Sequence, residues 1–172
     1  MNRITTGSLV LEPQTAAHAA EMFEVLSDPA IYEFENAPPA SAASLIERFT
    51  RLESRISPDS AEQWLNWVVR LPSGALAGYV QATITADRTA HIAYELASRF
   101  WRQGIGSAAV SGMLAELAAT YGVSTLVATL KSRNHRSLAL LQRLGFESLG
   151  SAAVDEVVMC KRLDGPAVSA RV

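Results

Sequence analysis

The chain has 172 residues, 49% of them hydrophobic and 19% charged, a composition that indicates a folded globular domain and excludes a disordered or fibrous chain. Its net charge of −2 lacks the basic excess that binding to a nucleic-acid backbone needs, and its single cysteine, Cys160, excludes a disulfide framework and a multi-cysteine metal site. Because there is neither a signal-type leader nor an apolar run of about 20 residues, we expect a cytoplasmic protein with no membrane or nucleic-acid partner and no metal.

The first third of the chain predicts one short strand and two helices. The strand is expected at residues 9–11, and the apolar spacing of residues 15–26 predicts a helix that Asp28 and Pro29 end. Residues 42–56 place their apolar side chains on one helical face and predict the second helix.

The middle third changes to a period of two, which is typical of strands. Three such segments, 64–71, 75–85 and 89–96, are separated by the short connections Pro-Ser-Gly and Ala-Asp-Arg. Connections of this length join antiparallel strands, so these segments predict an antiparallel meander.

The last third alternates helices with strands. The predicted elements are a helix over 104–121, a strand over 124–130, a helix over 134–144 and a strand over 154–162. This order predicts an α+β fold with a mixed sheet and with parallel pairing in its C-terminal half. We expect one domain over residues 1–163 and a flexible tail over residues 164–172.

The segment from Trp101 to Ser107 joins a predicted strand to an amphipathic helix and contains two glycines, Gly104 and Gly106. Glycines let the backbone approach a ligand, and the free N–H groups of a helix start favour an anion. The loop therefore predicts a site for a diphosphate, with Arg102 on its rim. A tight turn that binds nothing is the alternative.

Two phosphate-binding motifs can be compared with this loop. It does not match the P-loop, because no lysine occurs between Arg102 and Tyr121. Residues 104–109 do satisfy G-x-G-x-x-A, the fingerprint of dinucleotide-binding oxidoreductases. We disfavour that function because the loop follows an antiparallel meander instead of opening a βαβ unit, and because residues 124–130 contain no acid.

With Gly104 and Gly106, the loop resembles the Q/R-x-x-G-x-G/A signature of the GNAT superfamily of acetyl-CoA-dependent N-acyltransferases, although Trp101 stands where Gln or Arg is usual. The pair Phe100-Trp101 is similar to that of the branch containing the ribosomal-protein alanine N-acetyltransferases, and the resemblance extends over about residues 4–163. It implies a mixed, mostly antiparallel sheet with helices on both faces and a splayed parallel pair of strands at the coenzyme site.

The resemblance also implies which residues hold acetyl-CoA, the expected co-substrate. The segment from Asn134 to Phe146 is similar to the family's N-x-x-S/A helix that ends in G-F, and Asn134 is also a favourable N-cap. Many members place a tyrosine at the position of Leu141 to protonate the leaving thiolate. Leucine has no proton to donate, so the sequence does not identify the general acid of this chain. The expected coenzyme-binding residues are Leu96, Arg102, Gln103, Gly104, Ile105, Gly106, Ser107, Asn134 and Ser137.

Attack of an amine on a thioester needs a neutral nucleophile, stabilisation of an oxyanion and a proton for the thiolate. The resemblance implies that backbone N–H groups near Leu96 polarise the carbonyl. Glu95 beside them is the candidate to accept the amine proton, and a strand carboxylate without a catalytic role is the alternative. His91 has the same strand parity as Glu95 and is the reserve base, since both side chains should emerge on one face.

The acceptor is expected against the N-terminal part of the chain, where Glu33 and Glu35 are candidates to hold a cationic amine and Tyr32 or Phe34 to form an apolar wall. A polar connection without a binding role is the alternative. We expect a primary amine, either a protein or peptide N-terminus or a small molecule, and we leave open a homodimer. Two other functions stay open: a catalytically inactive acyl-CoA-binding sensor, because of Leu141, and a dinucleotide-binding oxidoreductase.

Overall fold

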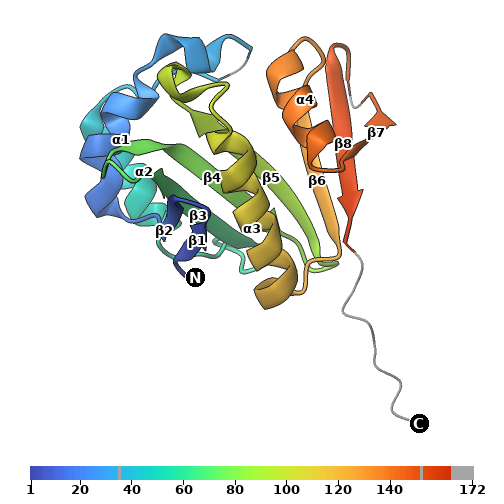
Figure 1. The fold of residues 1–172 in the computed structure, drawn as a ribbon. Coiled ribbons are helices and arrows are strands. Elements are labelled where there is room, and N and C mark those ends of the chain that lie inside the picture. Colours follow the sequence, from blue (N-terminus) through green and yellow to red (C-terminus); the bar gives the residue numbers. More distant parts are fainter. Residues whose placement is uncertain (35, 152, 164–172) are drawn as a thin grey trace.

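A single sheet runs through the computed structural model, which describes residues 1–34, 36–151 and 153–163 (Figure 1). The eight strands of this described part lie in the order β1-β2-β3-β4-β5-β6-β8-β7. They are β1 (Ile4–Thr6), β2 (Leu9–Pro13), β3 (Gln63–Arg70), β4 (Leu76–Ile84), β5 (Thr89–Leu96), β6 (Thr125–Lys131), β7 (Glu147–Gly150) and β8 (Glu156–Arg162). All neighbouring strands pair antiparallel except β5 and β6, which are parallel.

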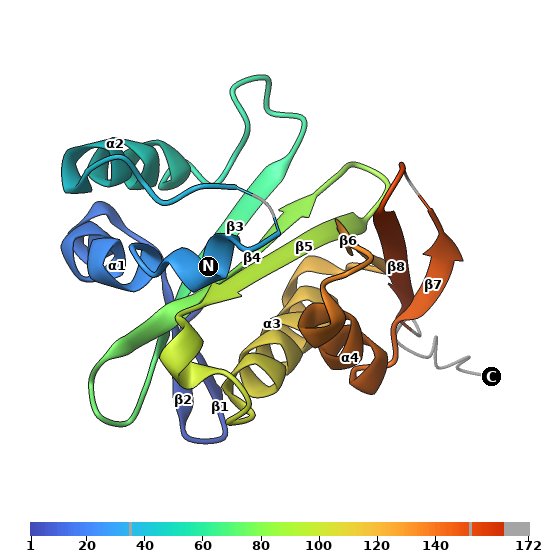
Figure 2. The same ribbon diagram turned by 90° about the horizontal axis from the view of Figure 1, so that it is seen from above.

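Helices cover both faces of the sheet (Figure 2). One face carries α1 (Ala19–Leu26) and α2 (Ala42–Leu52), and the other carries α3 (Ile105–Tyr121) and α4 (His135–Arg143). Alternation along β3 sends Trp67 into the core beneath α3 and Val68 into the core beneath α1 and α2. Short 3₁₀ turns link these elements: η1 (Ala16–His18), η2 (Pro29–Tyr32) and η3 (Ser98–Phe100).

The parallel strands β5 and β6 separate toward their carboxyl ends. Their register runs from Thr89 and Thr125 only as far as His91 and Val127, whereas β5 continues to Leu96 and β6 to Lys131. The mixed, mostly antiparallel sheet and its splayed parallel pair are therefore confirmed. The gap between the two strands opens at the edge where an open sheet places its ligands.

The expectation that the glycine loop does not open a βαβ unit was wrong. Because β5 and β6 are parallel and α3 connects them, the glycine loop does open a βαβ unit, although β5 also pairs antiparallel with β4. β5 and β6 pair over only three residues each, so the alternation pattern of the sequence does not indicate this pairing. The doubly wound sheet of dinucleotide-binding oxidoreductases is nevertheless absent from the described residues, since β5 and β6 form their one parallel pair.

Two strands were missed, and they change the C-terminal pairing. β1 has three residues and forms a hairpin with β2, while β7 is exposed along its whole length and so shows no apolar alternation. The chain leaves α4, reaches the sheet edge as β7 and returns as β8 between β7 and β6. The parallel pairing expected in the C-terminal half is found between β5 and β6, whereas β8 is antiparallel to both of its neighbours.

Element ends shift by a few residues elsewhere. α2 ends at Leu52 rather than at residue 56, and Ile56 is exposed. The first predicted helix begins as the turn η1, and α1 proper starts at Ala19. The predicted tail, residues 164–172, lies outside the described residues. Within the described ranges, no helix is both long and apolar enough to cross a membrane.

Asp28 ties the end of α1 to the segment before α3. Its carboxylate accepts the N–H of Ala30 at 3.0 Å as the N-cap of η2 and the N–H of Ser98 at 2.6 Å. The bond from Ser98, followed by that from Ala30, holds the pKa of Asp28 below its ordinary value of 3.8. A depressed pKa means that this stabilisation is present above about pH 4 and is lost as the pH falls through the folded value.

We expect Asp28→Ala to lower the free energy of unfolding by about 1 to 2 kcal/mol at pH 7, because two backbone donors lose their acceptor. Urea unfolding at pH 7 and at pH 3 checks this, and the difference between wild type and variant should shrink at the lower pH. An equal difference at both pH values would assign the loss to packing.

Candidate active site

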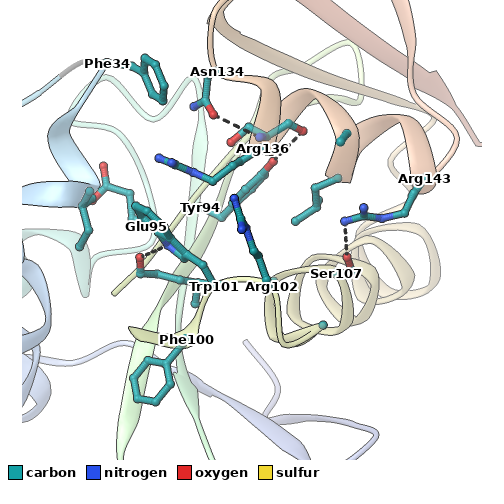
Figure 3. A pocket seen from close by; sticks show the side chains of 17 residues that line it. Phe34, Tyr94, Glu95, Phe100, Trp101, Arg102, Ser107, Asn134, Arg136 and Arg143 are labelled. Atoms are coloured by element: carbon teal, nitrogen blue, oxygen red, sulfur yellow. Dashed lines mark hydrogen bonds between the residues drawn. The ribbon is translucent and has the colours of Figure 1, made fainter. Parts of the chain in front are cut away.

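Two cavities meet beside the carboxyl end of β5. The first, of about 580 Å³, lies against the starts of α3 and α4, and the second, of about 410 Å³, extends toward α2. Figure 3 shows side chains of the first cavity converging from β5, from the loop before α3 and from α4. The described residues that line both cavities are Ile31, Phe34, Tyr94, Glu95, Asn134 and Ser137. A ligand in one cavity therefore reaches the other at Tyr94 and Glu95.

The first cavity contains an open helix start. Gly104 is the N-cap of α3 in the left-handed conformation, with φ of 77°, and no side chain caps the helix. The first helical bond runs from the Ala108 N–H to the Gly104 carbonyl at 3.0 Å, so the N–H groups of Ile105, Gly106 and Ser107 have no acceptor within the helix. This arrangement fits the diphosphate expected there, because N–H groups and the helix dipole both favour an anion.

Three guanidinium groups line the same cavity. Arg102 comes from the loop, whereas Arg136 and Arg143 come from the first and last turns of α4. The Arg143 side chain donates to the Ser107 hydroxyl at 3.5 Å, which links α4 to the start of α3. Of these three, only Arg102 was singled out from the sequence, because helix α4 reaches the loop through tertiary folding alone.

Arg136 lines the first cavity and contacts three residues around it. Its Cζ lies 3.8 Å from the ring centroid of Trp101 and 5.6 Å from that of Phe34, and its Nη2 lies 3.0 Å from the Glu33 carboxylate. Trp101 in turn donates from Nε1 to the Leu96 carbonyl at 2.8 Å. Trp101 therefore links the end of β5 to a guanidinium, at the position where Gln or Arg was expected.

The predicted coenzyme residues divide into two groups. Gln103 and Ile105 line neither cavity: the Gln103 amide donates to the Arg99 carbonyl at 2.7 Å, and Ile105 packs against the larger core. Asn134 also caps α4, since its Oδ1 accepts the Ser137 N–H at 3.2 Å. The predicted residues that the structure brings to the first cavity are Leu96, Arg102, Gly104, Gly106, Ser107, Asn134 and Ser137.

Glu95 faces a group of phenols in the second cavity. It pairs with Tyr79 across β4 and β5, and the Tyr79 hydroxyl is hydrogen-bonded to its carboxylate. Burial raises the pKa of Tyr79 well above its usual range, and the Glu95 charge adds to this effect. Burial first and Glu95 second also raise the pKa of Tyr32 to about 12. The Tyr79 phenol therefore remains a neutral donor to the carboxylate at physiological pH, whereas the neutral Tyr32 hydroxyl donates to the Leu26 carbonyl at 2.8 Å.

Other predicted residues lie elsewhere. His91 is exposed and lines neither cavity, because β5 carries it four residues away from Glu95 toward the paired part of the strands. Glu33 also lines neither cavity, and its carboxylate is paired with Arg136. Tyr32 does line the second cavity. Glu35 falls outside the described residues.

Comparison with known proteins decides the family. The sequence profile described as the acetyltransferase (GNAT) domain matches residues 8–147, which is most of the chain. The chain belongs to the GNAT acetyltransferase family. No curated protein sequence matches it significantly.

Solved structures share the fold of this GNAT acetyltransferase at low sequence identity. A ribosomal-protein-S5-alanine acetyltransferase from Vibrio fischeri is 17% identical, with a TM-score of 0.83 over 95% of this chain and 98% of the other. RimL, a ribosomal L7/L12 alpha-N-protein acetyltransferase in complex with coenzyme A, is 16% identical, with a TM-score of 0.82 over 96% and 100%. The aminoglycoside acetyltransferase AAC(6′)-Ib, also with coenzyme A, is 20% identical, with a TM-score of 0.75 over 90% and 95%.

The GNAT site has no tyrosine on α4. Leu141 is fully buried and lines the second cavity, one turn after Ser137. Among the described residues, no cluster of His, Cys, Asp and Glu is arranged to hold a metal ion.

With Glu95 as the expected base, Tyr79→Phe should shift the acid limb of the kcat profile to higher pH and lower kcat at neutral pH by about tenfold or less. The reason is that the lost hydroxyl stabilises the charged form of Glu95, which the variant then protonates at a higher pH. The measurement is the pH dependence of kcat. Tyr121→Phe is the matched control, because Tyr121 is half-buried at the end of α3 and lines neither cavity. Identical profiles for Tyr79→Phe and wild type would show that Tyr79 only packs.

Proposed function

We propose that this GNAT protein is an acetyl-CoA-dependent N-acetyltransferase that moves the acetyl group to a primary amine by direct attack. The observation that carries the proposal is the meeting of the two cavities at Glu95. One cavity has the open helix start and the arginines that suit a diphosphate, and the other is lined by phenols and a carboxylate that suit an amine. The coenzyme-bound relatives of the same fold, RimL and the aminoglycoside acetyltransferase, support the choice of co-substrate.

The end of β5 supplies a donor for the thioester carbonyl. Ala97 donates to the Ala77 carbonyl at 2.9 Å, so alternation in the antiparallel ladder turns the N–H and C=O of Leu96 away from β4. The Leu96 carbonyl accordingly accepts from Trp101, and the Leu96 N–H faces the gap beside β6. A donor fixed in this way stabilises the oxyanion of a tetrahedral intermediate without reorganising.

Acetyl-CoA supplies the activated acyl group when it is bound, and the residues of the chain do the rest. Glu95 accepts the proton that the amine loses as its nitrogen attacks the carbonyl carbon, either directly or through a water molecule. The Leu96 N–H holds the oxyanion, and Asn134, Ser137 and the start of α3 fix the coenzyme. The C–S bond then breaks, and the thiolate takes up a proton.

The acceptor class is the open part of the proposal. The second cavity presents Glu95, Arg48, Tyr32 and Tyr79 next to the apolar Phe34, so it suits an amine that carries both polar and apolar groups. The relatives named for ribosomal proteins and for an aminoglycoside favour testing both a peptide N-terminus and small-molecule amines. The lone Cys160 favours the cytoplasm as its setting.

The experiment is a thiol-release assay with acetyl-CoA and an acceptor panel of amino acids, polyamines, aminoglycosides and peptides with free N-termini. Release that depends on one acceptor class supports the proposal and names the substrate. Coenzyme binding in calorimetry without release for any acceptor would instead favour the sensor function. Binding of a nicotinamide coenzyme that acetyl-CoA does not displace would favour the oxidoreductase.

A further inference from the structure

Transfer to an amine leaves a coenzyme thiolate, and this leaving group needs a proton donor. The donor must lie where the two cavities meet, because that is where the C–S bond breaks. Of the six described residues that line both cavities, Tyr94 and Glu95 are the two that ionise. Glu95 has the opposite task in the proposed function, since it takes up the proton of the amine.

Tyr94 and Glu95 are neighbours on β5, and their side chains therefore lie on opposite faces of the sheet. Glu95 lies with Tyr79 on the face of α1 and α2, whereas Tyr94 packs against the core on the face of α3 and α4. Figure 3 shows this division, with Tyr94 reaching toward α4 and Glu95 lying toward the N-terminal segment. An acyl group held in the gap beside β5 would have the base on one side and the phenol on the other.

The Tyr94 hydroxyl is held at the start of α4. It donates to the backbone carbonyl of Ser137 at 3.4 Å, a long bond that is readily exchanged for a better acceptor. Leu141, one turn further along α4, is apolar and offers no competing donor. Burial raises the pKa of Tyr94, while the Ser137 bond and the charge of Arg143 oppose that rise. The phenol therefore keeps its proton near pH 7.

We propose that Tyr94 is the general acid of the transfer and donates its hydroxyl proton to the coenzyme sulfur as the C–S bond breaks. The inference rests on the proposed acetyl transfer. The electron pair of the C–S bond stays on sulfur, the tyrosine proton forms the S–H bond, and the resulting tyrosinate recovers a proton from water. Glu95 returns the amine proton to solvent, so the net products are the amide and the free thiol.

The first test needs no acceptor. Wild type, Tyr94→Phe and the matched control Tyr121→Phe are each saturated with coenzyme A, and alkylation of its thiol by iodoacetamide is followed against pH. A hydroxyl that donates to sulfur favours the thiolate, so the half-maximal rate should occur about one pH unit lower in wild type and the control than in Tyr94→Phe. Equal midpoints in all three proteins would overturn the inference.

The second test uses turnover with the acceptor found in the panel. Tyr94→Phe keeps the packed ring, so we expect acetyl-CoA affinity within about twofold and a kcat lower by about 10²-fold or more. Difluorotyrosine placed at position 94 ionises at lower pH, and it should restore turnover while moving the basic limb of kcat to lower pH. A Tyr94→Phe protein with wild-type kcat would overturn the acid role alone, whereas a wild type that binds acetyl-CoA without turnover would overturn the proposed function and this inference together.

Discussion

We expect Glu95→Gln to lower kcat by about 10²-fold or more while the affinity for acetyl-CoA changes little. Glutamine keeps the shape and the hydrogen bond from Tyr79 but cannot accept the amine proton. In wild type the acid limb of kcat reports protonation of the base, so this limb should disappear in the variant. Steady-state kinetics across pH, together with calorimetry of acetyl-CoA binding, measures both effects.

His91→Gln is the matched control for this prediction, because His91 lies on the same strand and lines neither cavity. Its kcat and its acid limb should equal those of wild type. If Glu95→Gln instead keeps turnover within a few-fold and retains the limb, then positioning of the substrates with water as the proton acceptor is the better mechanism.

Gly106→Val should weaken acetyl-CoA binding by about tenfold or more, which corresponds to about 1.4 kcal/mol. A Cβ at this position would lie 3.1 Å from the terminal methyl carbons of both Leu96 and Leu140, and the added methyl groups would crowd the first cavity. Isothermal titration calorimetry gives the affinity directly.

Ser111→Val controls for the β-branched residue itself, since Ser111 is an exposed position of the same helix. This variant should bind acetyl-CoA as wild type does. Wild-type affinity in a folded Gly106→Val protein would remove the start of α3 from the coenzyme site.

Local chemistry explains which parts could be predicted. The three meander strands are apolar segments separated by short turns, and α3 is capped by Gly104 and Gly122, so their ends agree with prediction to within a residue or two. β7 is exposed throughout and β1 has three residues, so neither has a pattern that a sequence can show. Because β7 was missed, the position of β8 between β6 and β7 could not be predicted.

In the site, too, residues within sequence motifs could be predicted, and residues brought together only by folding could not. The glycine loop and Asn134 carry motifs and were found, whereas Tyr79 and Arg136 were not, because only strand pairing and helix packing bring them to Glu95 and Trp101. Tyr94 was passed over although it adjoins Glu95. The role proposed for it depends on the gap beside β5, which opens because β5 and β6 pair only as far as His91 and Val127.

Direct acetyl transfer to the amine can be tested in a single-turnover reaction with acetyl-CoA that carries a deuterated acetyl group, followed by mass spectrometry of both products. We expect the label on the amine nitrogen of the acceptor, with one thiol formed per labelled amide. Glu95→Gln should slow the formation of both products equally. Direct transfer would be contradicted by labelled protein or by labelled acetate without amide. It would also be contradicted by bound acetyl-CoA that stays intact in the presence of every acceptor.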